Sequence, residues 1–142
     1  MLTLAIVKPD AVAAQHTGHV LTHLEQAGFT IRAARLVRLS AAQAEAFYAV
    51  HRERPFFRSL VAFMSSGPAL ALALERQDAV TTLRDVIGAT DPAEAKAGTI
   101  RKLYAQSKER NAIHASDSPE NAEREVAFFF PQAELTELAR RT

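Results

Sequence analysis

The sequence of 142 residues contains no cysteine and no tryptophan, and it has only five glycines and six prolines. The absence of cysteine excludes disulfide bonds and thiolate metal ligands, and it fits a reducing compartment such as the cytosol. No apolar run approaches the ~20 residues that a membrane-spanning helix needs. No basic segment precedes an apolar one at the start, so we expect no secretory signal. These absences predict a cytoplasmic protein with no membrane partner.

An excess of charge of one sign is also missing. The chain has 17 Lys and Arg against 16 Asp and Glu, which gives a formal net charge of +1. This balance disfavours a dedicated nucleic-acid binder, although Arg32, Arg35 and Arg38 lie along one predicted strand. The hydrophobic share of 48% and the charged share of 23% are ordinary for a globular protein. The length predicts one domain, residues 1–142.

The hydrophobic pattern predicts strands that alternate with helices. Four segments are predicted strands: 4–7, 29–39, 69–74 and 111–114. Five segments are predicted helices: 18–27, 41–50, a piece that begins at Pro55 and ends before Ser65, 78–88 and 118–129. Residues 89–108 are predicted to form a loop. The order β-α-β-α-α-β-α-β-α favours an α/β (α+β) ferredoxin-like sandwich with helices on one side of the sheet.

His114 ends the last predicted strand, directly before a run of small polar residues and the helix start at Ser118. Its imidazole is neutral near pH 7 and can act as a nucleophile or a base. Glu125, in the following helix, is placed to accept a hydrogen bond from the second ring nitrogen. The alternative is a structural histidine at a strand end, and the segment alone favours neither interpretation.

The sequence has 13 arginines and only four lysines. Lys8, Arg84 and Arg101 each lie near turn residues, where ligand-binding side chains are common. Each one alone is more typical of a solvated surface charge. Together with Thr90 and His114, they would form a site for a polyphosphate.

Glycine-rich phosphate-binding loops are absent, so a nucleotide would need another means of attachment. Phe56 or Phe57 could offer an aromatic face to a base, although at least one of them is expected in the core. His19 and His23 have the i, i+4 spacing of a metal pair, with His16 close by. No further ligand accompanies them, so a solvated helix face is the favoured interpretation.

Six short sequence motifs occur in order along the chain: 4–12 (LAIVKPDAV), 54–57 (RPFF), 63–68 (FMSSGP), 88–92 (GATDP), 98–101 (GTIR) and 111–118 (NAIHASDS). With these stretches the chain resembles nucleoside diphosphate kinases over essentially its whole length. Two alternatives stay open beside a kinase: a nucleic-acid-binding role and a non-catalytic ligand-sensing domain.

The resemblance implies a four-stranded antiparallel sheet and a ping-pong reaction, in which a nucleoside triphosphate phosphorylates a histidine that then phosphorylates a nucleoside diphosphate. It further implies that Mg²⁺ is carried by the nucleotide, with no metal site of the protein's own, and that the chain forms dimers that assemble into tetramers or hexamers. The implied roles are the nucleophile for His114, ring orientation for Glu125, a nearby hydroxyl for Tyr48, phosphate and ribose binding for Lys8, Arg84, Thr90, Arg101 and Asn111, and base stacking for Phe56.

The sequence departs from the family pattern at two places. Ala115 follows the histidine where the family usually has glycine, and a positive φ there would cost alanine about 1 kcal/mol. Lys102, Leu103 and Tyr104 follow Arg101 where small or acidic residues are more common. We expect neither departure to abolish activity.

Overall fold

The computed structural model describes residues 1–139, the last four by their backbone alone. Four strands, β1 (Leu2–Val7), β2 (Thr30–Val37), β3 (Ala69–Glu75) and β4 (Ile113–Ala115), form one sheet in the order β2-β3-β1-β4. All three neighbouring pairs are antiparallel. This arrangement confirms the predicted ferredoxin-like α+β fold.

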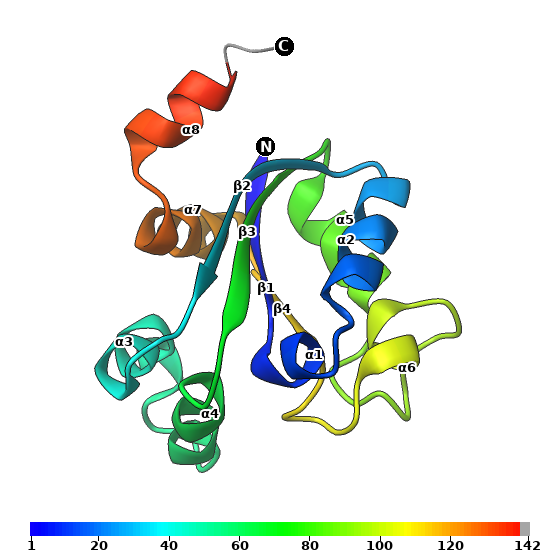
Figure 1. Cartoon of the computed structure of the whole chain (residues 1–142), viewed down its shortest axis with the longest axis vertical. Helices are drawn as coiled ribbons and strands as arrows, with labels where there is room; N and C mark the ends of the chain where they lie inside the picture. Colours follow the sequence, from blue (N-terminus) through cyan, green and yellow to red (C-terminus); the bar gives the residue numbers. More distant parts are fainter. Residues whose placement is uncertain (140–142) are drawn as a thin grey trace.

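Helices cover both faces of the sheet (Figure 1). One face carries α3 (Ala41–Phe47), α4 (Phe57–Met64), α7 (Pro119–Phe129) and α8 (Gln132–Ala139). The opposite face carries α1 (Pro9–Ala13), α2 (Thr17–Gln26), α5 (Ala79–Ile87) and α6 (Ile100–Tyr104). The prediction of helices on one side only is therefore wrong.

Strand β1 explains why both faces are covered. Leu4 and Ile6 belong to the core under α3, α4 and α7, whereas Ala5 and Val7 belong to the core under α2 and α5. Successive side chains of a strand point to opposite faces, so an unbroken apolar strand needs cover on both. All four side chains are fully buried.

Several boundaries differ from the predicted ones. Pro9 does not simply end β1: it occupies the first position of α1, where its missing N–H costs no hydrogen bond. The predicted loop 89–108 contains α6, which begins at Ile100 because the side chain of the preceding Thr99 caps it by accepting a hydrogen bond from the Lys102 N–H. The predicted helix 41–50 ends at Phe47 and continues as a 3₁₀ turn, Ala49–His51.

Helix α4 begins at Phe57, two residues later than predicted, and α8 was not predicted. Leu135 of α8 is buried in the core under α3, α4 and α7, which we call the first core. Its carbonyl accepts a hydrogen bond of 3.0 Å from Arg32 on β2. Packing of this short helix on the sheet thus stabilises it, since isolated helices of this length are marginal. Within residues 1–139, no helix is long and apolar enough to cross a bilayer.

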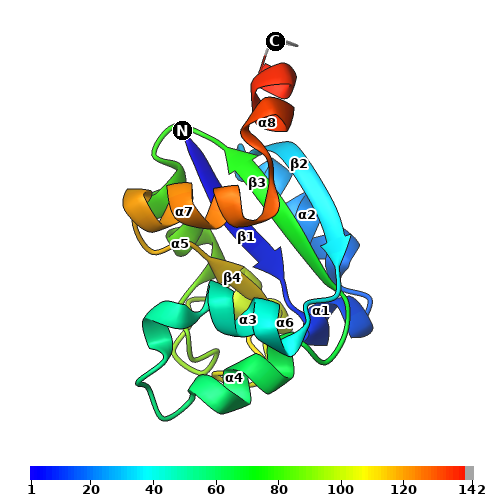
Figure 2. The same cartoon turned by 90° about the vertical axis from the view of Figure 1, so that its left-hand side faces the viewer.

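The short strand β4 lies between α7 and the α3–α4 region (Figure 2). Within the part of the chain that the structure describes, it pairs only with β1, through Ile6 opposite His114 and two flanking pairs. The end of β1, the turn before β4 and the loops around α3, α5 and α6 therefore meet around His114.

Candidate active site

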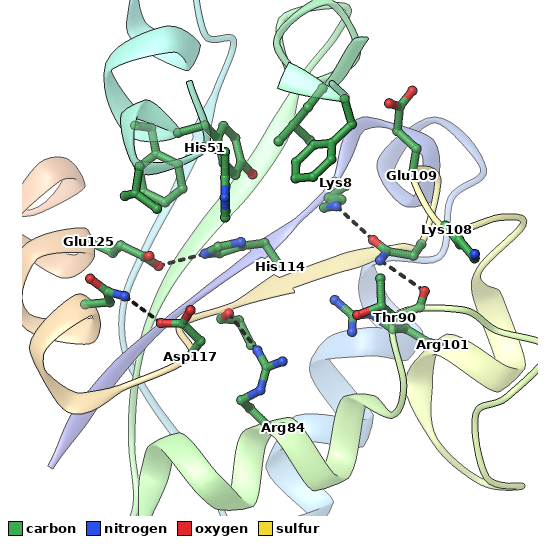
Figure 3. A pocket seen from close by; sticks show the side chains of 18 of the residues that line it. Lys8, His51, Arg84, Thr90, Arg101, Lys108, Glu109, His114, Asp117 and Glu125 are labelled. Carbon is green, nitrogen blue, oxygen red and sulfur yellow. Dashed lines mark hydrogen bonds and ion pairs between the residues drawn. The ribbon is translucent and has the colours of Figure 1, made fainter. Parts of the chain in front are cut away.

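A pocket of about 560 Å³ opens beside β4 (Figure 3). All nine residues that the sequence singled out for catalysis or nucleotide binding line it: Lys8, Tyr48, Phe56, Arg84, Thr90, Arg101, Asn111, His114 and Glu125. They come from helices, strands and turns that are spread along the chain from the end of β1 to α7. The fold thus gathers the whole predicted set in one place.

The ring of His114 is held by a carboxylate. Its Nε2 lies 2.7 Å from Oε1 of Glu125, which projects from α7. The Ser116 hydroxyl donates a 2.8 Å hydrogen bond to the same oxygen, and Nη2 of Arg124 lies 3.5 Å from Oε2. Both oxygens of Glu125 therefore have partners, which fixes the carboxylate and, through it, the imidazole.

Electrostatics keeps the imidazole neutral and the carboxylate charged. Burial lowers the pKa of His114, the positive charges of Lys8 and Arg101 lower it further, and the bond to Glu125 only partly offsets them. Burial alone would raise the pKa of Glu125, but the hydrogen bonds from His114 and Ser116 bring it below its usual value. Neutral His114 therefore carries its proton on Nε2 and donates a hydrogen bond from it to Glu125, which leaves the Nδ1 lone pair free.

Lys8 lies at the end of β1 and is 6% exposed. Its Nζ donates a 2.8 Å hydrogen bond to Oδ1 of Asn111, and the amide of Asn111 donates to the Thr90 carbonyl at 3.3 Å. Burial and the nearby Arg101 lower the pKa of Lys8 to about 8, against the opposing charges of Asp10 and Glu109. At pH 7 the side chain remains a cation.

Arg101 is fixed by backbone carbonyls. It donates to Gly88 O at 3.1 Å and to Ile113 O at 2.8 Å. Burial and the charge of Arg84 lower its pKa to about 10. Arg84, on α5, donates to Ala115 O at 3.4 Å.

Figure 3 shows Glu125 on one side of the His114 ring and the cations Lys8 and Arg101 on the other. Such a cluster of cations suits a polyanion.

The two adjacent phenylalanines have different surroundings. Phe57 packs against the first core, whereas Phe56 lines the pocket and is 47% exposed. Its ring centroid lies 5.5 Å from that of His51, another pocket residue. Phe56 is therefore the one of the two that can offer its face to a ligand.

Tyr48 packs edge-on against His114, with 5.8 Å between ring centroids. Its hydroxyl is buried and has no hydrogen-bond partner among the described residues. Burial, with a contribution from the charge of Glu125, raises the pKa of Tyr48 well above its usual value. The hydroxyl thus stays protonated and can donate a hydrogen bond into the site.

Comparisons with known proteins agree with this geometry. The family model described as "Nucleoside diphosphate kinase" matches residues 2–135. The chain belongs to the nucleoside diphosphate kinase family. Its activity is the transfer of the terminal phosphoryl group from a nucleoside triphosphate to a nucleoside diphosphate.

Named relatives and solved structures span nearly the whole chain. The nucleoside diphosphate kinase of Halorhodospira halophila is 54% identical over 133 residues, which cover 94% of either chain. The solved Aquifex aeolicus kinase has a TM-score of 0.92 and 48% identity, and the match covers 94% of this chain and 96% of that one. The Halobacterium salinarum kinase, solved in complex with CDP, has a TM-score of 0.90 and 38% identity, with 94% and 90% covered.

The two departures from the kinase pattern leave the pocket intact. Ala115 lies within β4, and the non-glycine residues with positive φ among those described are Gln15, Asp78 and Ala112. Alanine is therefore unstrained at position 115. Leu103 is exposed, and the Tyr104 ring packs 4.8 Å from that of His16. Neither Leu103 nor Tyr104 lines the pocket.

Several pocket residues were not predicted. Asp117 lines the pocket and Ser116 binds the pocket residue Glu125; both lie in the quoted stretch 111–118, so the motif itself contained a signal for them. Asn121 donates a 2.6 Å hydrogen bond to Asp117, and this bond lowers the pKa of that carboxyl despite its partial burial. His51 and Arg124 had no local signal, since only the fold brings them to the pocket.

The histidines of the first helical region do not form a cluster with other metal ligands. The rings of His16 and His19 lie 6.3 Å apart. Among the side chains that the structure describes, those of residues 1–135, no three His, Asp or Glu are arranged to hold a metal ion.

Proposed function

We propose that the kinase works in two steps through a phosphohistidine at Nδ1 of His114. In the first step the Nδ1 lone pair attacks the γ-phosphorus, the bond to the β–γ bridging oxygen breaks, and the nucleoside diphosphate leaves with that oxygen. In the second step a terminal phosphate oxygen of another nucleoside diphosphate attacks the phosphohistidine, and the N–P bond breaks. The 2.7 Å contact between Nε2 and Glu125 carries the proposal, because it assigns the proton to Nε2.

Other pocket residues each bind a different part of the nucleotide. Lys8, Arg84 and Arg101 neutralise the phosphate charge, and Asn111 and Thr90 contact the ribose and phosphates. Phe56 stacks on the base, and because every base has a π-face this contact tolerates many nucleotides. The CDP complex of the Halobacterium salinarum kinase supports a diphosphate as one substrate here.

We further propose that Mg²⁺ reaches the site on the nucleotide. Mg²⁺ commonly binds substrate phosphates with one or two carboxylates and several waters, and it supplies charge neutralisation for phosphoryl transfer. The ionised carboxylate of Asp117 lies in the pocket wall and suits the water shell of such an ion.

We propose that the chain binds nucleotides and associates with further copies of itself. We also propose that it acts in the cytoplasm and that residues 1–142 form one domain. Leu36 on the edge strand β2 is 65% exposed, which supports association between copies, and light scattering will give the number. Nucleic acid is not a proposed partner. Arg32 pairs with Glu75 at 2.7 Å and Arg35 with Glu134 at 3.9 Å, so two of the three strand arginines have acidic partners. A salt-dependent affinity for DNA would contradict this.

The test is a phosphoenzyme assay. Incubation with ATP labelled at the γ-phosphate should give an acid-labile phosphoprotein in the wild type and in His23→Ala, a histidine outside the pocket, but none in His114→Ala. Label that persists in a folded His114→Ala protein would show that another residue carries the phosphoryl group.

A further inference from the structure

The backbone makes a strained turn just before β4. The Ile113 N–H donates a 2.9 Å hydrogen bond to the Asn111 carbonyl, which closes a three-residue γ-turn around Ala112. Ala112 has a φ of 74°, and γ-turns with a positive central φ are rare and strained. The turn separates Asn111, which binds Lys8, from His114. An error in its geometry would therefore move both residues.

Both backbone polar groups of Ala112 are bound by the segment that follows β1. The Ala112 N–H donates a 3.1 Å hydrogen bond to Oδ2 of Asp10, and its carbonyl accepts one of 2.9 Å from the Lys8 N–H. Ala112 is fully buried, so bulk solvent does not reach these backbone groups. Of these two hydrogen bonds, only the one to Asp10 involves a side chain.

Asp10 is an unusual residue for its position. It is 7% exposed, and its Oδ1 is buried without a hydrogen-bond partner among the described residues. A buried carboxylate that is only partly hydrogen-bonded is costly, so its presence needs a reason other than stability. Its charge lies close enough to Lys8 to oppose the effect of burial on that side chain.

We propose that Asp10 is a positioning residue of the active site, whose carboxylate holds the strained turn at Ala112 and thereby places Asn111 and His114. Its negative charge also helps Lys8 to stay protonated. Both statements rest on the functions proposed above for His114, Asn111 and Lys8. Asp10 itself does not line the pocket, so it acts through these residues.

Two substitutions separate the hydrogen bond from the charge. Asp10→Asn keeps an oxygen that can accept the Ala112 N–H but removes the charge. Asp10→Ala removes both. We expect Asp10→Ala to lower kcat at saturating nucleotide by about 10- to 100-fold, because small displacements of reacting groups have effects of that size. We expect Asp10→Asn to keep kcat within about 3-fold of wild type but to move the alkaline limb of kcat/KM to lower pH.

A third variant tests the strain directly. Glycine adopts positive φ without penalty, so Ala112→Gly should reduce the need for Asp10. The double variant Asp10→Ala/Ala112→Gly should therefore recover part of the kcat lost in Asp10→Ala. Asp85→Asn, which removes an exposed carboxylate outside the pocket, is the matched control and should behave as wild type.

A residue that serves only the stability of the fold would give a different pattern. Asp10→Ala would then melt at lower temperature but keep wild-type kcat while folded, and Asp10→Asn would leave the alkaline limb in place. Those results would overturn the proposal. If Asp10→Ala does not fold, the proposal is tested by two other measurements. These are the pH profile of Asp10→Asn and the kcat of Asp10→Asn/Ala112→Gly, which should equal or exceed that of Asp10→Asn. The labelling of His114 is measured in the same preparations, so failure of the phosphohistidine itself is seen separately.

Discussion

The two sides of the His114 ring are built in different ways. On the carboxylate side, Glu125 is bound by His114, Ser116 and Arg124. On the cation side, Lys8, Arg84 and Arg101 have amide or carbonyl partners, and none of the three forms an ion pair with another described residue. One side is thus complete in the protein alone, whereas the positive charge of the other is only partly offset, at Lys8, by Asp10 and Glu109.

The pKa shifts reflect the same difference. The bonded carboxylate has a lowered pKa and stays charged, which is the favourable state for Glu125. Burial and mutual repulsion instead lower the pKa values of Lys8 and Arg101, which weakens their charged forms. We propose that the phosphate oxygens of a bound nucleotide reverse this unfavourable arrangement. The carboxylate side should therefore control kcat, and the cation side should control substrate binding.

The largest effect is expected from Glu125→Gln. The glutamine amide can donate to Nε2 and so move the ring proton to Nδ1, which removes the nucleophilic lone pair. We expect kcat to fall by up to about 10⁴, the loss that accompanies a histidine left in the wrong tautomer, with little change in KM. Steady-state kinetics will measure it, with Glu123→Gln, an exposed neighbour on α7, as the control. A change confined to KM would contradict the division of roles.

Lys8→Met should act mainly on binding. Losing a charged hydrogen-bond donor to a phosphate costs about 1.5–3 kcal/mol, so kcat/KM should fall by roughly 10- to 100-fold. Nucleotide affinity measured by calorimetry should fall in parallel. Lys96→Met, an exposed lysine outside this pocket, serves as the control. Unchanged affinity in Lys8→Met would remove this residue from the phosphate site.

Deprotonation of Lys8 should give the wild-type enzyme an alkaline limb. With a pKa of about 8, Lys8 is a cation below pH 8 and becomes neutral above it. We expect kcat/KM to fall above pH 8, by up to about tenfold per pH unit. The limb in kcat should lie at higher pH, because bound phosphates favour the charged amine. In Lys8→Arg the limb near pH 8 should disappear, and its persistence there would assign it to another group.

The smallest effect is expected from Ala115→Gly, which restores the residue usual in the family. Ala115 pairs with Ala5 in the sheet and needs no positive φ. Glycine in a strand costs about 0.5–1 kcal/mol, so the free energy of unfolding should fall by that amount. Denaturant unfolding will measure it, and kcat should stay within about 2-fold of wild type. A large gain in kcat would mean that alanine disturbs the carboxylate side after all.

Much of the fold could be predicted from local patterns. The apolar runs at 4–7 and 69–74 indicated buried strands, and Ser118 and Pro119 indicated the start of α7. The short helix α6 was missed because five residues give too little periodicity to detect. Helix α8 was missed because its stability depends on packing against β2 rather than on its own sequence.

The candidate site could be predicted in the same uneven way. Lys8, Arg101 and His114 stood next to turn signals, and the resemblance supplied roles for them and for six other residues. Ser116, Arg124 and Asp10 received no role, since what they do depends on which atoms lie beside them. The bond from Ala112 to Asp10 joins residues 102 positions apart, and no local pattern carries that information.

By itself, the sequence determined that this chain has no thiol, little net charge, a ferredoxin-like order of strands and helices, and a histidine beside a set of cations. These properties follow from composition and from short-range periodicity. Only the tertiary structure decided that Glu125 binds Nε2 and not Nδ1, that Phe56 and not Phe57 faces the pocket, and that the strained residue is Ala112 and not Ala115. Each of these depends on contacts between distant segments, which exist only when both faces of the sheet are packed.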